Sequence, residues 1–273
     1  MSPPVFIILV THNSARELEF CLAHLARQTL APEKVVIVDS GSDSTRYLEN
    51  LNYPGKLLVC RKDNIGFGRA NNFGLAQLPV TGGAIGVFIN PDTFLTRDFI
   101  ARMCRIFAEK PDISVLTGKL LGFDLQEGAP TGKIDSTGIS RRWYGRWYDR
   151  GQGEEDRGQY GSCEYLQAAC GALLCCRGEM LAQLGLQFFD EDFFMYKEDI
   201  ELGFRLRKLG YKVLYDPSLI AYHCRGWQRA RQKMTLAVRL LAARNEVLLY
   251  RKHPSPYMLW AVCKYLLVRF TGI

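Results

Sequence analysis

Short apolar runs that end in polar clusters recur through the first 120 residues and constrain the fold more than any other feature. The longest are residues 5–10 and 84–89, and shorter ones lie at 35–38, 57–60 and 113–117. Continuous apolar runs of this length are typical of parallel strands buried on both faces. Because segments with a helical spacing of apolar residues lie between them, the sequence predicts an α/β fold with a mostly parallel central sheet flanked by helices.

Polar residues directly follow three of these predicted strands. Thr11 and Asn13 follow the first strand, Asp39 follows the second, and Asn90 and Asp92 follow the fourth. In open parallel sheets, ligands bind at the carboxyl ends of the strands. We therefore expect these side chains to gather at one edge of the sheet and to form a binding site there.

The second half of the chain has a less regular pattern. Residues 122–165 are rich in glycine, aromatic and charged residues, which indicates a long excursion containing hairpins. Excursions of this length in compact domains are usually functional. A helix is predicted near 179–184 and a second one ending at Gly210, followed by two short strands at 212–215 and 219–223.

The net charge of +7 is concentrated near the C-terminus. Residues 223–273 contain ten Lys and Arg and a single Glu, whereas residues 1–222 carry a slight excess of acid. The sequence therefore predicts a body at 1–222 and a basic helical extension at 223–273, with helices expected at 228–252 and 257–270. No nucleic-acid partner is expected, because few aromatic side chains are interleaved with these charges.

Cellular location is constrained by apolar segments and cysteines. No stretch approaches the roughly 20 apolar residues of a membrane-spanning helix, and residues 1–4 lack the basic start of a signal peptide. The nine cysteines are odd in number and include no C-x-x-C pair, which argues against a disulfide framework or a structural zinc site. We therefore expect the chain to act in the cytoplasm.

A glycine turn containing Asn64, Gly66, Gly68 and Asn71 opens a predicted helix. Glycines at this place let the backbone approach a phosphate, and a helix N-terminus favours negative charge. The motif does not match the dinucleotide-binding fingerprint, because Asn71 occupies the third small position and the motif follows the third strand. A plain glycine turn with an asparagine cap fits the same residues, so both interpretations stand.

Acidic residues and one histidine are the candidates for chemistry. Asp92 at a strand end is placed to hold Mg²⁺ or Mn²⁺ through its oxygens, or else to cap the next helix. Glu198 and Asp199 follow an aromatic segment, and apolar surroundings raise the pKa of a carboxylate, as a general base requires. His223 ends a predicted strand, where it is either a structural residue or a metal ligand.

Taken in order, these motifs resemble glycosyltransferase family 2, whose members are inverting nucleotide-sugar enzymes with the GT-A fold. The resemblance is greatest to the rhamnosyltransferase-like branch, and it extends from residue 5 to about residue 252. The matching stretches are residues 10–13, 37–43, 64–74, 88–93, 193–202, Arg205, 210–211, Pro217, 223–226 and 244–245.

The resemblance implies a role for each candidate residue. Three positions would contact the nucleobase and ribose, three would line the nucleotide-sugar pocket, and two would face the diphosphate. In that order, they are Thr11, Asn13, Asp39, Asn64, Gly66, Asn71, Asn90 and Asp92. Asp199 would be the catalytic base, with Glu198 as the alternative, and His223 would join Asp92 at a divalent metal.

One departure from the family pattern affects this metal. Asn90 stands where the first aspartate of the family's D-x-D motif is usual, so Mg²⁺ or Mn²⁺ would have one anionic ligand fewer. The implied reaction is a single in-line displacement with inversion. Within the body, residues 1 to about 120 would bind the nucleotide sugar, and residues 121–222 would contribute the acceptor and catalytic groups.

The resemblance also implies the substrates. The expected donor is deoxythymidine-diphosphate rhamnose, with a uridine-diphosphate hexose as the alternative, and the expected acceptor is a hydroxyl of a cell-surface or lipid-linked glycan. Residues 257–270 are apolar but too short to span a bilayer, so the extension fits the inner face of an anionic membrane, packing on the body, or a homodimer. A non-catalytic glycan- or nucleotide-binding module of the same fold is the rival interpretation.

Overall fold

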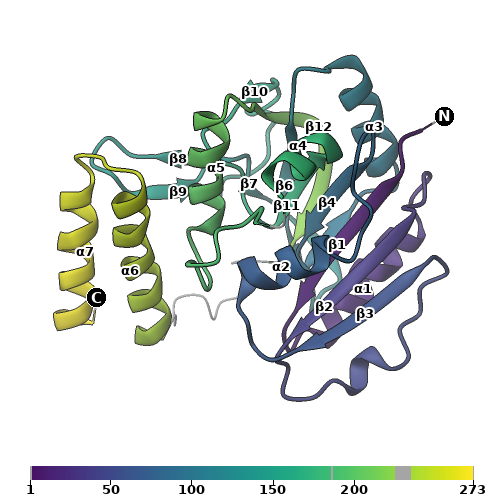
Figure 1. Cartoon of the computed structure of the whole chain (residues 1–273), viewed down its shortest axis with the longest axis horizontal. Helices are drawn as coiled ribbons and strands as arrows, with labels where there is room; N and C mark the ends of the chain where they lie inside the picture. Colours follow the sequence, from purple (N-terminus) through teal and green to yellow (C-terminus); the bar gives the residue numbers. More distant parts are fainter. Residues whose placement is uncertain (1, 186, 225–234, 273) are drawn as a thin grey trace.

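Within residues 2–185, 187–224 and 235–272, which the computed structural model describes, ten strands form one central sheet (Figure 1). Eight strands lie in the order β10-β12-β6-β11-β4-β1-β2-β3, with β5 paired to β12 and β7 paired to β6. These strands are Val5–Thr11 (β1), Lys34–Ser40 (β2), Leu57–Lys62 (β3), Ile85–Ile89 (β4), Thr93–Leu95 (β5), Val115–Asp124 (β6), Ala129–Ser136 (β7), Glu164–Tyr165 (β10), Leu173–Arg177 (β11) and Val213–His223 (β12).

Parallel pairing dominates the sheet. β1 pairs in parallel with both β2 and β4, β2 pairs in parallel with β3, and β6 pairs in parallel with β12. β11 runs antiparallel between β4 and β6, a position that its apolar sequence does not distinguish from that of a parallel strand. The predicted α/β fold with a mostly parallel sheet is confirmed.

Helices cover both faces of this sheet (Figure 1). The helices on the faces of the sheet are Ala15–Ala26 (α1), Phe67–Leu75 (α2), Phe99–Glu109 (α3), Gly178–Leu184 (α4) and Glu198–Lys208 (α5), with a short 3-10 helix at Arg46–Leu48. Two more helices, Leu236–Lys252 (α6) and Met258–Thr271 (α7), lie beyond the sheet (Figure 1). Because side chains alternate along a strand, Ile7 and Leu9 of β1 pack with α1 and α3, whereas Phe6 and Ile8 pack with α2, α4 and α5. The central strands are therefore buried on both sides, as their continuous apolar runs predict.

The prediction of two short strands at 212–215 and 219–223 is wrong, because both belong to the single strand β12. The register of β12 against β6 shifts between Asp216 and Ile220. Pro217 has no N–H to contribute to the ladder, and Asp216 Oδ1 accepts a hydrogen bond from Ser218 N at 2.9 Å. The chain bulges there and then resumes the same pairing, so the interruption in the sequence marks a bulge.

The excursion at 122–165 contains the hairpins that its composition predicts. β6 and β7 form one hairpin, and Ile139–Arg141 (β8) pairs with Trp147–Asp149 (β9) to form another. Trp147 is buried against α6, where its Nε1 donates a hydrogen bond to Tyr250 Oη at 3.0 Å. The β8–β9 hairpin, α5, α6 and α7 thus share a small apolar core.

The C-terminal extension is helical, as predicted. α6 and α7 lie side by side at the end of the molecule away from β3 (Figure 1). The predicted helix start at residue 228 and four of the basic residues counted in the extension lie outside the described residues. None of the helices in the described part of the chain has both the length and the apolar character needed to cross a bilayer.

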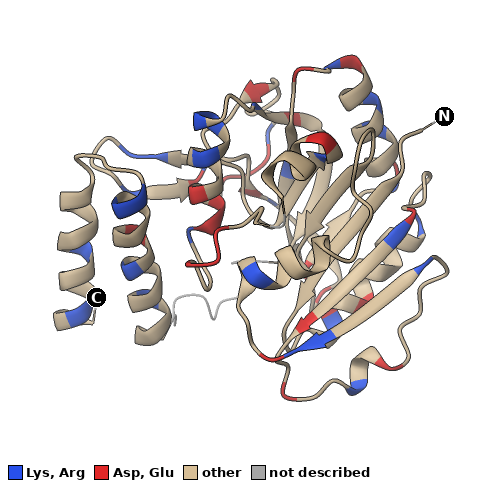
Figure 2. Cartoon of the chain, in the orientation of Figure 1, with Lys and Arg blue, Asp and Glu red and all other residues tan. Residues whose placement is uncertain are grey.

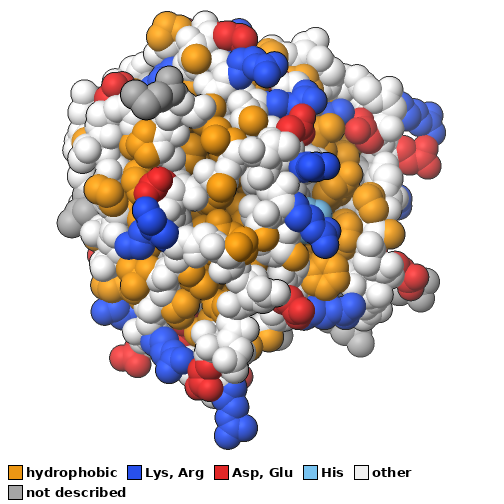
Figure 3. All heavy atoms as spheres, turned by 90° about the vertical axis from the view of Figure 1, so that its right-hand side faces the viewer, with side chains coloured by type: hydrophobic (Ala, Val, Ile, Leu, Met, Phe, Trp, Pro, Cys, Tyr) orange, Lys and Arg blue, Asp and Glu red, His pale blue; other side chains and the backbone are white. Residues whose placement is uncertain are grey.

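Charge is unevenly distributed between the two ends of the molecule. Lys and Arg positions, in blue, recur along α6 and α7, whereas acidic positions, in red, gather near α5 and around the loops of the body (Figure 2). The opposite face, on the side of β3, carries apolar side chains across its middle with charges of both signs around them (Figure 3). The two ends therefore differ in electrostatic character.

Candidate active site

A cavity of about 530 Å³ lies at the carboxyl ends of β1, β2 and β4. This is the edge of the sheet where the polar residues after the predicted strands are expected to meet. Seven of the candidate residues line it together, and they come from four separate parts of the chain. They are Thr11, Asn64, Gly66, Asn90, Asp92, Glu198 and Asp199.

Asp39, another candidate residue, does not line the cavity. It is 1% exposed, and its Oδ1 accepts hydrogen bonds from Ser42 Oγ at 2.5 Å and from Tyr47 Oη at 3.1 Å. Tyr47 Oη lies 3.0 Å from Thr11 Oγ1. Asp39 is thus linked to the cavity through Tyr47 and Thr11, and its direct contact with a nucleoside stays a prediction.

Asn13 and Asn71 are also outside the cavity lining. Asn13 has a left-handed backbone, with φ of 51°, and its side chain exchanges two hydrogen bonds with Asp43 at 3.0 and 2.8 Å. Asn71 is buried and donates from Nδ2 to Phe67 O at 3.0 Å. The Asn13 side chain joins two loops, whereas the Asn71 side chain bonds within α2. The proposed contacts of both residues with the donor stay predictions.

Gly66 is required by the backbone at the start of α2. Its φ is +82°, and a Cβ at this position would lie 2.5 Å from Phe194 O. Phe67 N, which a phosphate cradle would use, donates to Phe194 O at 2.8 Å. Gly66 N donates to Asn64 Oδ1 at 3.3 Å. The glycine turn is thus held by its own hydrogen bonds, and no side chain among the described residues caps α2. Asn64 and Gly66 both line the cavity, and their contact with a nucleotide sugar stays a prediction.

Asp92 lines the cavity, and behind it lies His223, which it contacts but which does not itself line the cavity. His223 Nε2 lies 3.3 Å from Asp92 Oδ1, and its Nδ1 lies 2.7 Å from Asp135 Oδ2. Burial acts to lower the pKa of His223, but the carboxylates of Asp92 and Asp135 outweigh it and raise the pKa to about 9. His223 is fully buried, so its ring orientation is set by these two acids.

Sequence reasoning missed Asp135. It is buried in β7, and 88 residues separate it from His223. No local pattern links the two positions, because their proximity arises only when β7 and β12 both join β6. A histidine that donates Nδ1–H to a carboxylate can present Nε2 to a metal, an arrangement usual at metal sites. Because the pKa of His223 is raised to about 9, an ion bound there would have to displace the proton from Nε2.

The residues present fit a divalent metal as part of a site. Asp92 contributes carboxylate oxygens and His223 contributes an imidazole nitrogen, and Mn²⁺ accepts both. Within the described ranges, no group of three or more His, Cys, Asp and Glu side chains is arranged to hold an ion by itself. An ion bound by these two residues would need further oxygen ligands, which the phosphates of a bound substrate usually supply.

The carboxylate pair, Glu198 and Asp199, lines the same cavity from the first turn of α5. Asp199 is held in place by backbone N–H groups, since Oδ2 accepts from Gly171 N at 3.3 Å and Oδ1 accepts from Ile200 N at 2.8 Å. Glu198 is 7% exposed. Burial, and then the charge of Asp199, raise the pKa of Glu198 to about 8. At neutral pH the pair therefore keeps a proton on Glu198.

The raised pKa of Glu198 predicts a pH-dependent stability. Between pH 4.5, the ordinary pKa, and about 8, the folded chain holds a proton that the unfolded chain has lost, so stability falls as pH rises through this window. We expect Glu198→Gln to remove this penalty, so that its Tm relative to wild type increases from pH 5 to pH 8. Thermal scans across this range measure the difference, and a constant difference would contradict the assignment.

The excursion supplies another wall of the cavity. Trp147 and Tyr148 of β9 line it, together with Met195 and with Ala242 of α6. The aromatic cluster in the sequence indicated a functional loop but did not show which of its residues reach the cavity. Trp143, of the same cluster, is 86% exposed. Planar and apolar side chains next to Asp199 suit the faces of a sugar ring, so this wall is a candidate acceptor surface.

Comparison with known proteins identifies the class. Residues 6–162 match the family model described as glycosyl transferase family 2, and because this is more than half of the chain, the chain belongs to that family. It is also 28% identical, over 238 residues, to the N-acetylglucosaminyl-diphospho-decaprenol L-rhamnosyltransferase of Mycobacterium tuberculosis. That alignment covers 80% of this chain and 75% of the relative, in agreement with the expected similarity to rhamnosyltransferases.

Solved structures share the fold. The chain superimposes on GalNAc-T7, solved with UDP, GalNAc and Mn²⁺, with a TM-score of 0.67 and 17% identity over 92% of this chain and 48% of that one. It superimposes on the mannosyltransferase PcManGT of Pyrobaculum calidifontis, solved with GDP-Man and Mn²⁺, with a TM-score of 0.59 and 19% identity over 99% and 71%. The fold is therefore GT-A, as expected.

Proposed function

We propose that this chain is an inverting glycosyltransferase that moves a sugar, in the first instance rhamnose, from a nucleoside diphosphate to a hydroxyl of a lipid-linked or cell-surface glycan. The observation that carries the proposal is that Asp92 and Asp199, 107 positions apart in the sequence, line one and the same cavity. The name of the mycobacterial relative supports rhamnose and a lipid-linked acceptor. A uridine-diphosphate hexose is the alternative donor.

Asp199 is the catalytic base of the proposed reaction. Its carboxylate takes the proton of the acceptor hydroxyl as that oxygen forms a bond to the anomeric carbon. The bond from this carbon to the diphosphate breaks, and its electron pair leaves with the nucleoside diphosphate. Because attack and departure occur on opposite faces of the sugar, the configuration inverts. Asp199 is the proposed base because two backbone N–H groups hold its carboxylate in the cavity, whereas burial and the neighbouring Asp199 raise the pKa of Glu198.

Asp92 and His223 are the residues that would hold a divalent metal. When bound, such an ion would neutralise charge on the leaving diphosphate. Asn90 lines the same part of the cavity and can donate a hydrogen bond through its amide, but it contributes no charge. The proposal therefore expects metal-dependent donor binding with a single anionic protein ligand.

A panel of nucleotide sugars tests the donor. We expect the purified chain to release nucleoside diphosphate from one of them with Mn²⁺ present, and faster when a lipid-linked N-acetylglucosaminyl acceptor is added. Faster release from deoxythymidine-diphosphate rhamnose than from uridine-diphosphate hexoses would support the proposed donor, and the reverse would support the alternative. If the chain binds a nucleotide sugar but releases nothing from it under any condition, the non-catalytic binding module becomes the better account.

We propose in addition that α7 rests on an anionic membrane. Its outward side exposes large apolar side chains that recur at helical spacing, namely Leu259, Val262, Leu266, Leu267 and Phe270. Trp143 is also exposed. It lies near α7, since its neighbour Tyr144 packs against Trp260 of α7 with the ring centroids 5.1 Å apart. Basic side chains along α6 and α7 (Figure 2) supply the complementary charge for acidic headgroups. A lipid-linked acceptor would be met at such a surface.

Vesicle co-sedimentation tests this contact. We expect wild type to bind vesicles containing phosphatidylglycerol, to be released by salt, and to lose binding by about tenfold or more in the double variant Leu259→Ser with Phe270→Ser or on truncation after Lys252. Leu209→Ser is the matched control, because Leu209 is 54% exposed on the body. Equal binding of all forms would contradict the proposal, and a stable dimer without vesicle binding would indicate a homodimer.

A further inference from the structure

The turn that leads into α5 has an unusual backbone. Tyr196 and Lys197 are consecutive non-glycine residues with positive φ, at 72° and 74°. Residues in this conformation persist only where the surrounding structure holds them. Lys197 is the N-cap of α5, so these two residues set the direction in which Glu198 and Asp199 enter the cavity.

Asn245 of α6 holds this turn. Its Nδ2 donates to Met195 O at 2.8 Å and to Tyr196 O at 3.0 Å. Asn245 is 3% exposed, so water has little access to replace these bonds. Both bonds end on the carbonyls immediately before the second left-handed residue, Lys197. On its other side, the same loop is tied to α2, where Phe194 O accepts from Phe67 N.

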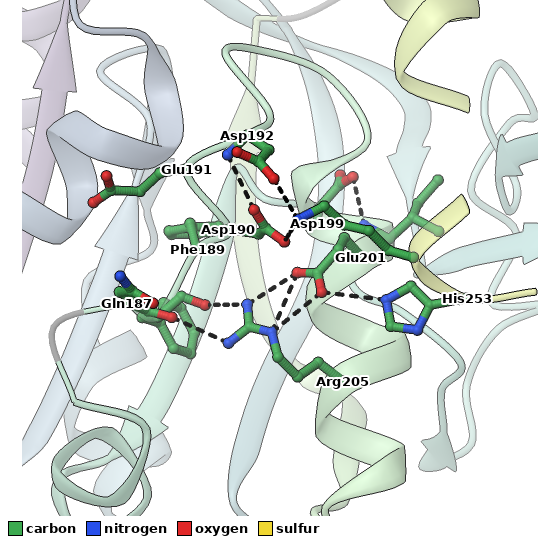
Figure 4. Close-up of polar contacts among 12 residues, drawn as sticks. Gln187, Phe189, Asp190, Glu191, Asp192, Asp199, Glu201, Arg205 and His253 are labelled. Atoms are coloured by element: carbon green, nitrogen blue, oxygen red, sulfur yellow. Dashed lines mark hydrogen bonds and ion pairs between the residues drawn. The ribbon is translucent and has the colours of Figure 1, made fainter. Parts of the chain in front are cut away.

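α6 also contacts the chain on both sides of the carboxylate pair. Lys252 forms ion pairs with Asp190 at 2.8 Å and with Asp192 at 2.5 Å, ahead of the pair. His253 Nε2, just beyond α6, lies 3.3 Å from Glu201 Oε1, after the pair (Figure 4). The loop and the start of α5 are thus held by the C-terminal extension along their length.

We propose that Asn245 is a positioning residue for Asp199, an inference that rests on the proposed function. It does not line the cavity and acts through the 195–197 turn, whose conformation it fixes. The basic extension is then part of the catalytic unit, in addition to any contact that α7 makes with a membrane. The predicted boundary between body and extension at residue 222 therefore divides the catalytic unit, since Asn245 lies in the extension and Asp199 in the body.

Asn245→Leu tests the inference, because leucine keeps the approximate size and removes both donors. A misplacement of about 1 Å costs roughly a hundredfold in rate, so we expect kcat to fall by about tenfold or more while the donor KM stays within about twofold. Asn72→Leu is the matched control. Asn72 is 3% exposed and exchanges two hydrogen bonds with the Phe189 backbone, at 2.8 and 2.9 Å, away from the turn.

We expect the control to lower Tm comparably and to change kcat far less. An equal loss of kcat in both variants, or wild-type kcat in Asn245→Leu, would overturn the inference. Hydrogen–deuterium exchange gives a readout that needs no turnover, with faster exchange at residues 194–200 expected only in Asn245→Leu. Unchanged exchange there would overturn the inference by itself, whereas absent turnover in wild type would count against the proposed function instead.

Discussion

Asp199→Asn is expected to bind the nucleotide-sugar donor with wild-type affinity and to turn it over about 10²–10⁴-fold more slowly. The asparagine keeps the shape of the side chain and can keep its bond from Ile200 N, but it cannot take a proton from the acceptor. In the proposed mechanism the donor is bound through Asp92, a different residue of the same cavity. Calorimetry gives the affinity, and nucleoside diphosphate release gives the rate.

Two further variants identify the source of that loss. Glu198→Gln removes the neighbouring carboxyl, which already holds a proton at neutral pH, so we expect a smaller loss than in Asp199→Asn. Asp98→Asn makes the same chemical change outside the cavity, where Asp98 pairs with Arg102 on α3, and we expect normal turnover. A larger loss in Glu198→Gln than in Asp199→Asn would move the base to Glu198, and normal turnover in Asp199→Asn would end the assignment.

Asp92→Ala is expected to lose the gain in donor affinity that Mn²⁺ gives the wild-type chain. With Asn90 beside it, Asp92 is the anionic protein ligand expected at the diphosphate, so its removal leaves only the imidazole of His223. We expect the metal-dependent part of the affinity to fall by about tenfold or more, as losses at metal sites typically do. Calorimetry with and without Mn²⁺ measures both values.

His223→Gln accompanies this experiment, because it removes the imidazole and leaves the Asp92 carboxylate in place. We expect it to weaken metal-dependent binding less than Asp92→Ala, since the anionic ligand remains. Circular dichroism checks that the buried glutamine is accommodated. If Asp92→Ala keeps the full Mn²⁺-dependent gain in affinity, the metal is not held at this place.

Much of the site follows from strand ends that can be recognised in the sequence. The apolar runs before Thr11 and Asn90 mark where β1 and β4 end, and parallel strands bring such ends to one edge. Glu198 and Asp199 were recognisable because an aromatic segment leads into two adjacent acids. The hairpins of the excursion were predictable for the same kind of reason, from local glycine and aromatic composition.

The remaining features depend on contacts between distant segments. Asp135 gains its role only because β7 pairs with β6 and thereby approaches His223. Asn245 lies 50 positions from Met195, whose carbonyl it binds, and nothing in a helical stretch announces that contact. Asp39 is a polar residue at a strand end that does not reach the cavity. Its carboxylate instead accepts hydrogen bonds from Ser42 and Tyr47. Local patterns give positions along the chain, whereas these roles arise from tertiary packing.

The configuration of the product tests the central claim most directly. Wild type and Asp199→Asn are incubated with the donor that the panel selects, Mn²⁺ and a lipid-linked N-acetylglucosaminyl acceptor, and the new linkage is read by NMR. We predict a glycoside with the anomeric configuration opposite to that of the donor, formed by wild type and nearly absent with Asp199→Asn. A product that retains the donor's configuration, or equal yields from both proteins, would contradict direct displacement with Asp199 as the base.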